Sequence, residues 1–439
     1  MIMKYFIYLL LIICSFEGIC QKQLTLNEAI NIALKNNLEI ELARNEVAIA
    51  SNNNFIGVAG GLPTINASVS DQQQLQDIKQ RTLTTLTGPN AGVREFNNVQ
   101  GNIFSANATA SYVLFNGMRI RATKSRLEAL ESQNKFLLNA QIQSTISQVM
   151  LSYYDIIRQQ NYERTIAQSI AVSEEKLKIV ENQQKVGMAN NADLFQARVD
   201  VNNLRQSLIS QQLIATQSRT DLFTLLNLPA DSTYLITDSI AVDTLLRVES
   251  IINTLDKNYE LMAADQEIKV NDLLVRETAS QRYPSLRLNA GYNYNRTESQ
   301  GGFFLLNRTN GPFVGAALNI PIYNGNTFSR QEQSARISAK SAAVRKNLIR
   351  RNLEGNIIKL NQSYKAALAQ LQTGTENYKI AKELLDLVVQ RFELKQATIV
   401  DVKLAQQSFE NAGYLLTNLS FAAKSAEIEL KRIGNQLGY

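Results

Sequence analysis

The chain of 439 residues contains no histidine and no tryptophan, and both of its cysteines, Cys14 and Cys20, lie in the first 20 residues. The rest of the chain therefore lacks imidazole and thiol groups, which serve most often as catalytic bases, nucleophiles and ligands of transition metals. We also find no glycine-rich phosphate loop and no cluster of residues at metal-ligand spacing. The sequence predicts a protein that is not an enzyme and that needs no cofactor.

Strong charge of one sign is also missing. The formal net charge is +6, with 45 basic and 39 acidic residues spread along the chain. A nucleic-acid-binding protein concentrates its positive charge in a patch or a stripe. The only adjacent arginines, Arg350 and Arg351, lie in a segment with helical periodicity. We therefore expect no nucleic-acid partner.

Beyond residue 20 no apolar run reaches the 18 or more residues of a membrane-spanning helix. Residues 1–20 are predicted to be a signal peptide, with Lys4 before a short apolar run and a cleavage site before Gln21. In the alternative, Cys20 becomes the lipid-carrying first residue of a lipoprotein, although Glu17 and Ile19 fit such a site poorly. Cleavage after Cys20 would leave the mature chain without a thiol.

Two very long helices dominate what the sequence does contain. Residues 119–185 include no proline and no glycine, and they are followed by a turn at 186–191 and a returning helix. A helix of that length extends about 100 Å, which exceeds the depth of a single globular core. The same arrangement recurs at 327–393, with a turn near 394–399.

The two hairpins are related by an offset of about 208 residues, which predicts an internal repeat. Apolar residues spaced three and four apart line the first returning helix and recur at this offset in the second. Such seams are typical of antiparallel coiled-coil packing. The first repeat is assigned to residues 21–226, with its hairpin at 119–226, and an equatorial linker to 227–248. The second repeat is assigned to 249–439, with its hairpin at 327–434.

The N-terminal part of each repeat carries its own signals. Thr25 and Glu28 form a predicted capping box that opens a helix, and we expect this helix to continue to about residue 55. The segment 34–39 recurs at 255–260, at an offset of about 221 residues. One short strand is expected around residues 234–236, inside the linker.

Four strands are predicted, because apolar and polar residues alternate there with a period of two. They lie at about 62–70, 103–115, 285–295 and 313–322, and the polar segment 71–100 is expected to be a long exposed loop. Strands of about ten residues match the length that crosses a bilayer at a tilt. Four strands leave open edges, which lipid does not tolerate, whereas three chains would close a barrel of twelve strands. The alternative is a non-channel periplasmic coiled-coil scaffold with a small β-sheet cap.

The turns carry a resemblance to a known family. Val186-Gly187-Met188, with Asp193-Leu194 and Ala197, resembles the first hairpin turn of TolC-like outer-membrane efflux proteins. Arg391-Phe392, Thr398 and Asp401-Val402 resemble the second turn, and the likeness covers about residues 24–434. It implies a mainly α fold with membrane β, built as a homotrimer with a β-barrel in the outer membrane and a long α-helical tunnel in the periplasm. It also implies a passive exit duct of a tripartite efflux or type I secretion system, opened by a periplasmic adaptor and an inner-membrane pump.

By this resemblance, the turns are the candidate sites at which the adaptor docks. The residues are Val186, Gly187 and Met188 in the first turn and Lys395, Gln396 and Thr398 in the second. Lys395 stands at the position that Gly187 occupies in the first repeat. This departure leaves open whether the two turns share one geometry.

Asp193, Asp401 and Leu404 are the candidate residues of a periplasmic gate. In a trimer the two aspartates would place six carboxylates around a narrow closed end. Leu404 and Ala397 occupy the positions where another acid and its basic partner would be sought, so apolar contacts would contribute to closure. The alternative is that both aspartates only cap the returning helices and offset their dipoles, at about 1 kcal/mol each.

Overall fold

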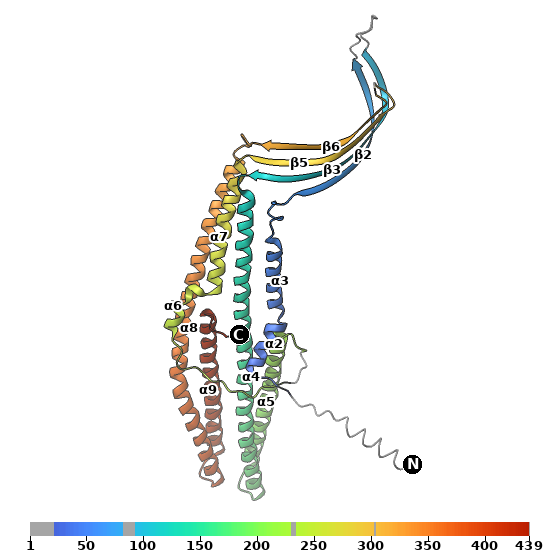
Figure 1. Cartoon of the computed structure of the whole chain (residues 1–439). Helices are drawn as coiled ribbons and strands as arrows, with labels where there is room; N and C mark the ends of the chain where they lie inside the picture. Colours follow the sequence, from blue (N-terminus) through green and yellow to red (C-terminus); the bar gives the residue numbers. More distant parts are fainter. Residues whose placement is uncertain (1–21, 82–92, 230–233, 303, 439) are drawn as a thin grey trace, which may run out of the picture. The chain divides into compact units, whose positions relative to one another are not determined.

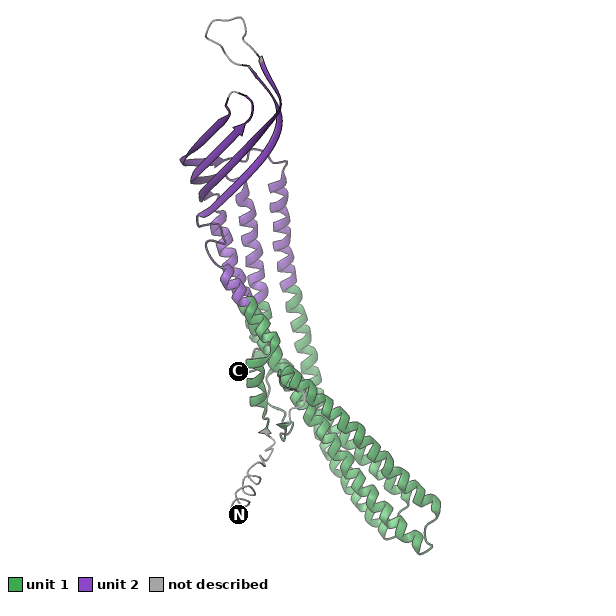
Figure 2. Cartoon of the chain, turned by 90° about the vertical axis from the view of Figure 1, so that its right-hand side faces the viewer, with its two compact units in different colours: residues 1–46, 135–262, 347–439 green, residues 47–134, 263–346 purple. Residues whose placement is uncertain are grey.

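The computed structural model describes residues 22–81, 93–229, 234–302 and 304–438. The predicted signal peptide, residues 1–20, lies outside the described residues, as does its cleavage site before Gln21. The chain folds into two compact units (Figure 2). Unit 1 comprises residues 1–46, 135–262 and 347–439, and unit 2 comprises residues 47–134 and 263–346. Each unit therefore takes segments from both predicted repeats.

The predicted long helical hairpins and the four strands are present (Figure 1). In chain order the elements are β1 (Lys22–Gln23), α2 (Leu26–Asn36), α3 (Leu38–Asn53), β2 (Thr64–Arg81), β3 (Val93–Asn116), α4 (Arg119–Lys185), α5 (Asn191–Leu225), β4 (Tyr234–Leu235), α6 (Val248–Asn253), η1 (Leu255–Lys257), α7 (Tyr259–Ala279), η2 (Ser280–Arg282), β5 (Ser285–Ser299), β6 (Leu306–Asn319), α8 (Thr327–Glu393) and α9 (Ile399–Ile433). Within the described residues, no helix combines the length and the apolar character needed to cross a bilayer.

The hairpins pack as antiparallel pairs in unit 1. Arg198 and Arg205 of α5 form salt bridges to Glu181 and Glu174 of α4, so the contacts progress in opposite directions along the two helices. The predicted seam of α5 is buried at Leu194, Ala197 and Val201, and the first two pack in one apolar cluster with residues of α8 and α9. Burial of this stripe, more than helix propensity, stabilises such long helices.

The expectation of one helix from Thr25 to about residue 55 is wrong, because the helix breaks at Asn37. The capping box of Thr25 and Glu28 is present and opens α2, but Asn37 is extended and separates α2 from α3. Its buried side chain accepts hydrogen bonds from the backbone N–H groups of Glu39 and Ile40 and donates one to the carbonyl of Leu225. Asn37 thus caps α3 and ties it to the end of α5.

Asn258 makes the same set of contacts at the equivalent position of the second half. It accepts from the N–H groups of Glu260 and Leu261, and its Nδ2 donates to the carbonyl of Ile433 at 2.9 Å. Asn37 and Asn258 are separated by the offset of about 221 residues at which segment 34–39 recurs as 255–260. The short strand expected in the linker is also present, since β4 pairs in parallel with β1.

The predicted loop at 71–100 is wrong in most of its extent. β2 continues to Arg81 and β3 begins at Val93, and the two strands pair along this stretch with a bulge near Gln76. There the Asp77 carboxylate accepts the N–H of Asn98, and Lys79 pairs with Glu95. The segment shows no apolar alternation because much of it is exposed on both faces. Cross-strand pairing holds it extended.

The register of the sheet, in the order β2-β3-β5-β6, aligns the apolar side chains of all four strands on one face. That face carries Ile65, Ala67 and Val69 of β2, Ala106, Ala108, Ala110 and Tyr112 of β3, Leu288, Ala290 and Tyr292 of β5, and Pro312, Val314, Ala316 and Leu318 of β6. The other face carries mainly serine, threonine, asparagine and glycine. Val314 is 84% exposed, so the described chain itself does not cover the apolar face.

Candidate functional site: the two helical turns

The first turn is built by the end of α4. The N–H of Gly187 donates to the carbonyl of Gln184, and the N–H of Met188 donates to that of Gln183. This pair of bonds is a Schellman motif, which requires a left-handed residue at Gly187, where φ is +76°. Asn190 then caps α5 by accepting the N–H of Asp193 at 2.8 Å.

The second turn has the same geometry although it contains no glycine. The N–H groups of Lys395 and Gln396 donate to the carbonyls of Phe392 and Arg391, and Lys395 takes the left-handed conformation with φ of +61°. The question left open by the sequence is thereby answered: the two turns share one backbone arrangement. Lys395 adopts a conformation that glycine would adopt without strain.

The two turns lie side by side. The ammonium group of Lys395 contacts the sulfur of Met188 at 2.6 Å, which joins the ends of the two hairpins. Val186, Met188 and Leu394 are each about two-thirds exposed, so the paired turns present apolar side chains to solvent. Gln396 and Thr398 are exposed in the same region. The structure thus brings together the docking candidates of both repeats.

Asp401 serves as part of a cap. Its carboxylate accepts hydrogen bonds from the N–H and the hydroxyl of Thr398, and its own N–H donates to the Thr398 hydroxyl. These bonds, first the one from the Thr398 backbone, lower the pKa of Asp401 below its ordinary value. Within one chain, the contacts of Asp401 are therefore those of a residue that caps α9, as the alternative interpretation of the sequence predicts.

Asp193 and Leu404 make no side-chain hydrogen bond within the described residues. The Asp193 carboxylate accepts no hydrogen bond within the described residues, although its backbone N–H is bound by Asn190. Leu404 lies one turn beyond Val400 on α9, and both side chains are more than half exposed. Unlike the docking turns, the three gate candidates are not joined to one another by a side-chain hydrogen bond or an ion pair within the described residues.

Sequence reasoning missed a buried ionic link close to the turns. Lys176 of α4 is buried to 1% exposure and binds Asp200 of α5 at 2.7 Å, and Lys403 of α9 reaches the other carboxylate oxygen at 3.3 Å. Asp200 therefore connects three helices of both hairpins. The sequence contains a sign of this link. Lys176 is the one charged residue of a helical stripe that also contains Ser169, Ser173 and Val180, and a lone charge on such a stripe indicates a buried ion pair.

The charge state of this link follows from its surroundings. Burial raises the pKa of Asp200, but hydrogen bonds from Lys176 and Gln196 and the charges of Lys176 and Lys403 outweigh burial and lower the pKa overall. Asp200 is consequently ionised at neutral pH. One carboxylate that is largely withdrawn from water thus pairs with two lysines on neighbouring helices, and the three groups together keep a net charge of +1.

A family model described as "Outer membrane efflux protein" matches residues 29–228 and 251–436, which make up most of the chain. The chain belongs to this outer membrane efflux protein family. The predicted resemblance to TolC-like proteins is thereby confirmed, as is the prediction that the chain is not an enzyme, since members of the family are channels. Membership also places this efflux protein in the outer membrane. No curated protein gave a match to the chain.

Solved structures support the fold of this efflux protein. The outer membrane protein VceC of Vibrio cholerae is 18% identical, with a TM-score of 0.73, over 93% of this chain and 96% of that chain. The CmeC outer membrane channel of Campylobacter jejuni is 16% identical, with a TM-score of 0.74, over 97% and 92%. The MtrE outer membrane channel of Neisseria gonorrhoeae is 18% identical, with a TM-score of 0.69, over 94% and 89%.

Proposed function

We propose that this efflux protein is the exit duct of a tripartite export machine, a homotrimer whose three sheets close one barrel of twelve strands in the outer membrane. The observation that carries the proposal is the sheet, which has one continuous apolar face and one polar face, and whose edge strands β2 and β6 have no further partner strand among the described residues. In a transmembrane barrel with a water-filled interior, the apolar face of the strands lies against lipid and the polar face lies toward the water.

The directions of the strands support closure by identical copies. Each neighbouring pair in the order β2-β3-β5-β6 is antiparallel, so β2 and β6 run in opposite directions. The β6 edge of one copy can therefore pair with the β2 edge of the next without breaking the antiparallel pattern. Closure satisfies the edge N–H and C=O groups that lipid would leave without partners.

Exposed apolar residues on the hairpins support the same assembly. On α5 they include Phe195, Val199, Ile209 and Leu213, and on α8 they include Ile380, Leu384 and Leu387. Their three- and four-residue spacing makes stripes that fit neighbouring helices. We infer that these stripes pack between subunits and that the hairpins form the wall of a periplasmic tunnel.

The paired turns are the proposed docking site of the periplasmic adaptor, through Val186, Gly187 and Met188 with Lys395, Gln396 and Thr398. Each turn has a residue in the left-handed conformation, and the two adjacent turns present exposed apolar side chains to a partner. The inner-membrane pump and the adaptor would supply the energy and the opening movement, and the duct itself would be passive.

The function is tested by conductance. Full-length protein purified from outer membranes is expected to run as a heat-modifiable trimer on gels and to give single-channel currents in planar bilayers. Trimers that never conduct would contradict the proposal and favour the periplasmic coiled-coil scaffold. A monomer that remains in the aqueous phase would contradict it as well.

For the gate, we predict that Asp401→Ala and Leu404→Ser each increase conductance and the uptake of large antibiotics. Asp401 also caps α9, so Thr398→Ala is the matched control: it removes the cap and keeps the carboxylate. Asp193→Ala removes a carboxylate that accepts no hydrogen bond within the described residues, so its effect on conductance measures the contribution of the charge alone. If Thr398→Ala raises conductance as much as Asp401→Ala, loss of the cap explains the effect and the gate role is refuted.

A further inference from the structure

The ends of the helices next to the sheet carry positive charge. Within unit 2, four arginines lie in the terminal helical turn adjacent to the strands: Arg119 and Arg121 of α4, Arg276 of α7 and Arg330 of α8. All four are exposed, and none forms an ion pair or a side-chain hydrogen bond within the described residues. We call these residues the foot arginines.

Neighbouring acids do not neutralise them. Segments 47–63, 116–127, 276–290 and 320–335 contain two acidic residues, Glu277 and Glu332. Arg126 binds Glu277, and Arg282 and Arg336 bind Glu332. Both acids of these segments are therefore already paired with other arginines.

Three of the foot arginines also lie where a cation costs stability. Arg119, Arg121 and Arg330 are in the first turns of α4 and α8, and neither helix has an acidic residue in that turn. A helix N-terminus carries partial positive charge and free N–H groups, so it favours an anion. Both helices thus begin with positive charge that has no anionic partner within the described residues.

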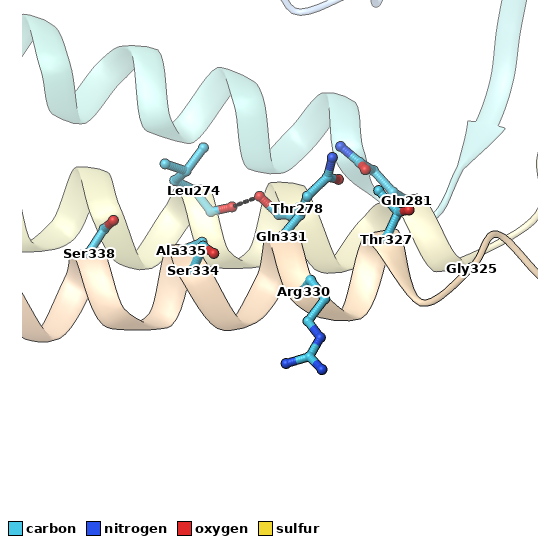
Figure 3. A pocket seen from close by; sticks show the side chains of 10 residues that line it. All are labelled: Leu274, Thr278, Gln281, Gly325, Thr327, Arg330, Gln331, Ser334, Ala335 and Ser338. Atoms are coloured by element: carbon cyan, nitrogen blue, oxygen red, sulfur yellow. Dashed lines mark hydrogen bonds between the residues drawn. The ribbon is translucent and has the colours of Figure 1, made fainter.

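A groove beside Arg330 offers further donors. It has a volume of about 650 Å³, lies along α7 and α8, and is lined by Gln281, Gln331, Ser334 and Ser338 as well as Arg330 (Figure 3). These five side chains form no hydrogen bonds within the described residues, and no carboxylate lines the groove. Figure 3 shows Arg330 projecting outward from α8. Such a donor-rich groove fits a phosphate group.

Exposed apolar side chains lie in the segments next to these arginines. Phe55, Val58, Met118, Tyr283, Ile322 and Tyr323 are all more than half exposed at the same end of the sheet. Exposed rings and aliphatic groups interleaved with arginine are typical of segments at a membrane–water interface.

We propose that the foot arginines bind the phosphate-bearing headgroups of anionic phospholipids, and that one headgroup lies in the groove beside Arg330. The partner is the leaflet of the outer membrane that meets the ends of these helices. This inference rests on the proposed placement of the sheet in the bilayer. It adds a lipid requirement that channel formation alone does not imply.

Lipid retention tests the proposal. The full-length protein is reconstituted in nanodiscs of phosphatidylcholine, or of phosphatidylcholine with phosphatidylglycerol, and retained lipids are counted by native mass spectrometry after transfer to detergent. The wild type is expected to retain phosphatidylglycerol preferentially. Each arginine near a charged surface contributes about five-fold in affinity, so Arg119→Gln/Arg121→Gln/Arg330→Gln should weaken retention on the order of a hundred-fold.

A matched control removes the same charge elsewhere. Lys359, Lys365 and Lys382 are exposed lysines of α8 in unit 1 that form no ion pair within the described chain. Their triple change to Gln should leave the preference for phosphatidylglycerol intact. Equal losses in both triple variants would show that net charge, and not the foot of the sheet, controls retention, and the proposal would be wrong.

Two further outcomes would overturn it. Equal retention of both lipids by the wild type would remove the anion preference, and displacement of the lipid by millimolar inorganic phosphate would identify a free-phosphate site. Planar-bilayer currents are recorded in parallel. A wild type that conducts without lipid preference refutes the lipid proposal and leaves the channel intact, whereas a wild type that never conducts refutes the proposed function.

Discussion

At the scale of single residues, the two turns show how one backbone geometry is reached from different sequences. Gly187 was a turn former by its chemistry alone, because glycine takes positive φ without strain. Lys395 could not be assigned the same role from its type. Its left-handed conformation is imposed by the Schellman bonds to Phe392 and Arg391, which α8 and α9 hold in place.

We predict that Lys395→Gly raises stability and Gly187→Ala lowers it, each by about 1 kcal/mol. The reason is the left-handed backbone at both positions. Gly355, in the middle of α8 with open space around its Cα, is the control: Gly355→Ala should stabilise by about 1 kcal/mol. Melting temperatures followed by circular dichroism check the three signs. A stabilising Gly187→Ala would contradict the assigned geometry.

The buried Asp200 link is a second prediction at this scale. Asp200→Asn leaves Lys176 buried without a counter-charge and should cost about 3 kcal/mol at neutral pH. Adding Lys176→Met to Asp200→Asn should recover most of the loss, because no buried charge then remains. Denaturant unfolding of the two variants measures the difference, and an equally unstable double variant would show that the ionic link is not the cause.

The same link predicts a pH dependence. The pKa of Asp200 in the folded protein lies below that of an unfolded aspartate, which is about 3.9. Its stabilising contribution is therefore complete above that pH and is lost as the pH falls through the lower folded pKa. The stability gap between wild type and Asp200→Asn should stay constant from about pH 5 to 8 and shrink below about pH 4.

At the scale of elements, the sheet illustrates the difference between a period and a register. Alternation in each strand predicted two faces, but four strands could be paired in several registers, each with its own surface. The observed pairing of Ala108 with Tyr292, and of Leu288 with Ala316, sets all apolar sides on one face. A slip of one residue would mix the faces.

Two adjacent alanines of β6 test this assignment. Ala316 lies on the apolar face and Ala317 on the polar face, and both are exposed. Ala316→Arg should lower outer-membrane assembly, because an arginine facing lipid costs free energy, about 2–4 kcal/mol at the bilayer centre and less toward the interface. Ala317→Arg should assemble normally. The amount of heat-modifiable trimer in outer-membrane fractions compares them, and equal assembly would contradict the proposed lipid face.

At the scale of the whole molecule, the unpaired edges β2 and β6 make an assembly prediction. With Cys14 and Cys20 replaced by Ser, one cysteine is introduced at Ala317 of β6 and another at Thr64, Asn66, Ser68 or Ser70 of β2, all on the polar face. Oxidation should give covalent dimers and trimers for at least one pair. Moving the second cysteine to Thr109, on the inner strand β3, should give none. Absence of cross-links in every β2 variant would contradict closure by identical subunits.

Much of the architecture was determined by the sequence alone. The absence of proline and glycine from 119–185, the sustained apolar seams and the turn at Gly187 fixed the hairpins to within a residue, because local periodicity and chain stiffness decide such helices. The capping box of Thr25 and Glu28 was equally local. These features need no partner far away in the chain.

Tertiary contacts decided the rest. Asn37 breaks a helix that its neighbours favour because the carbonyl of Leu225 lies within reach, and the polar run after Asp71 becomes a strand because β3 pairs with it. Asp200 joins α4, α5 and α9 although its partners are distant in sequence. In each case a stabilising hydrogen bond or ion pair joins segments that are distant in sequence, and local periodicity does not identify the partner.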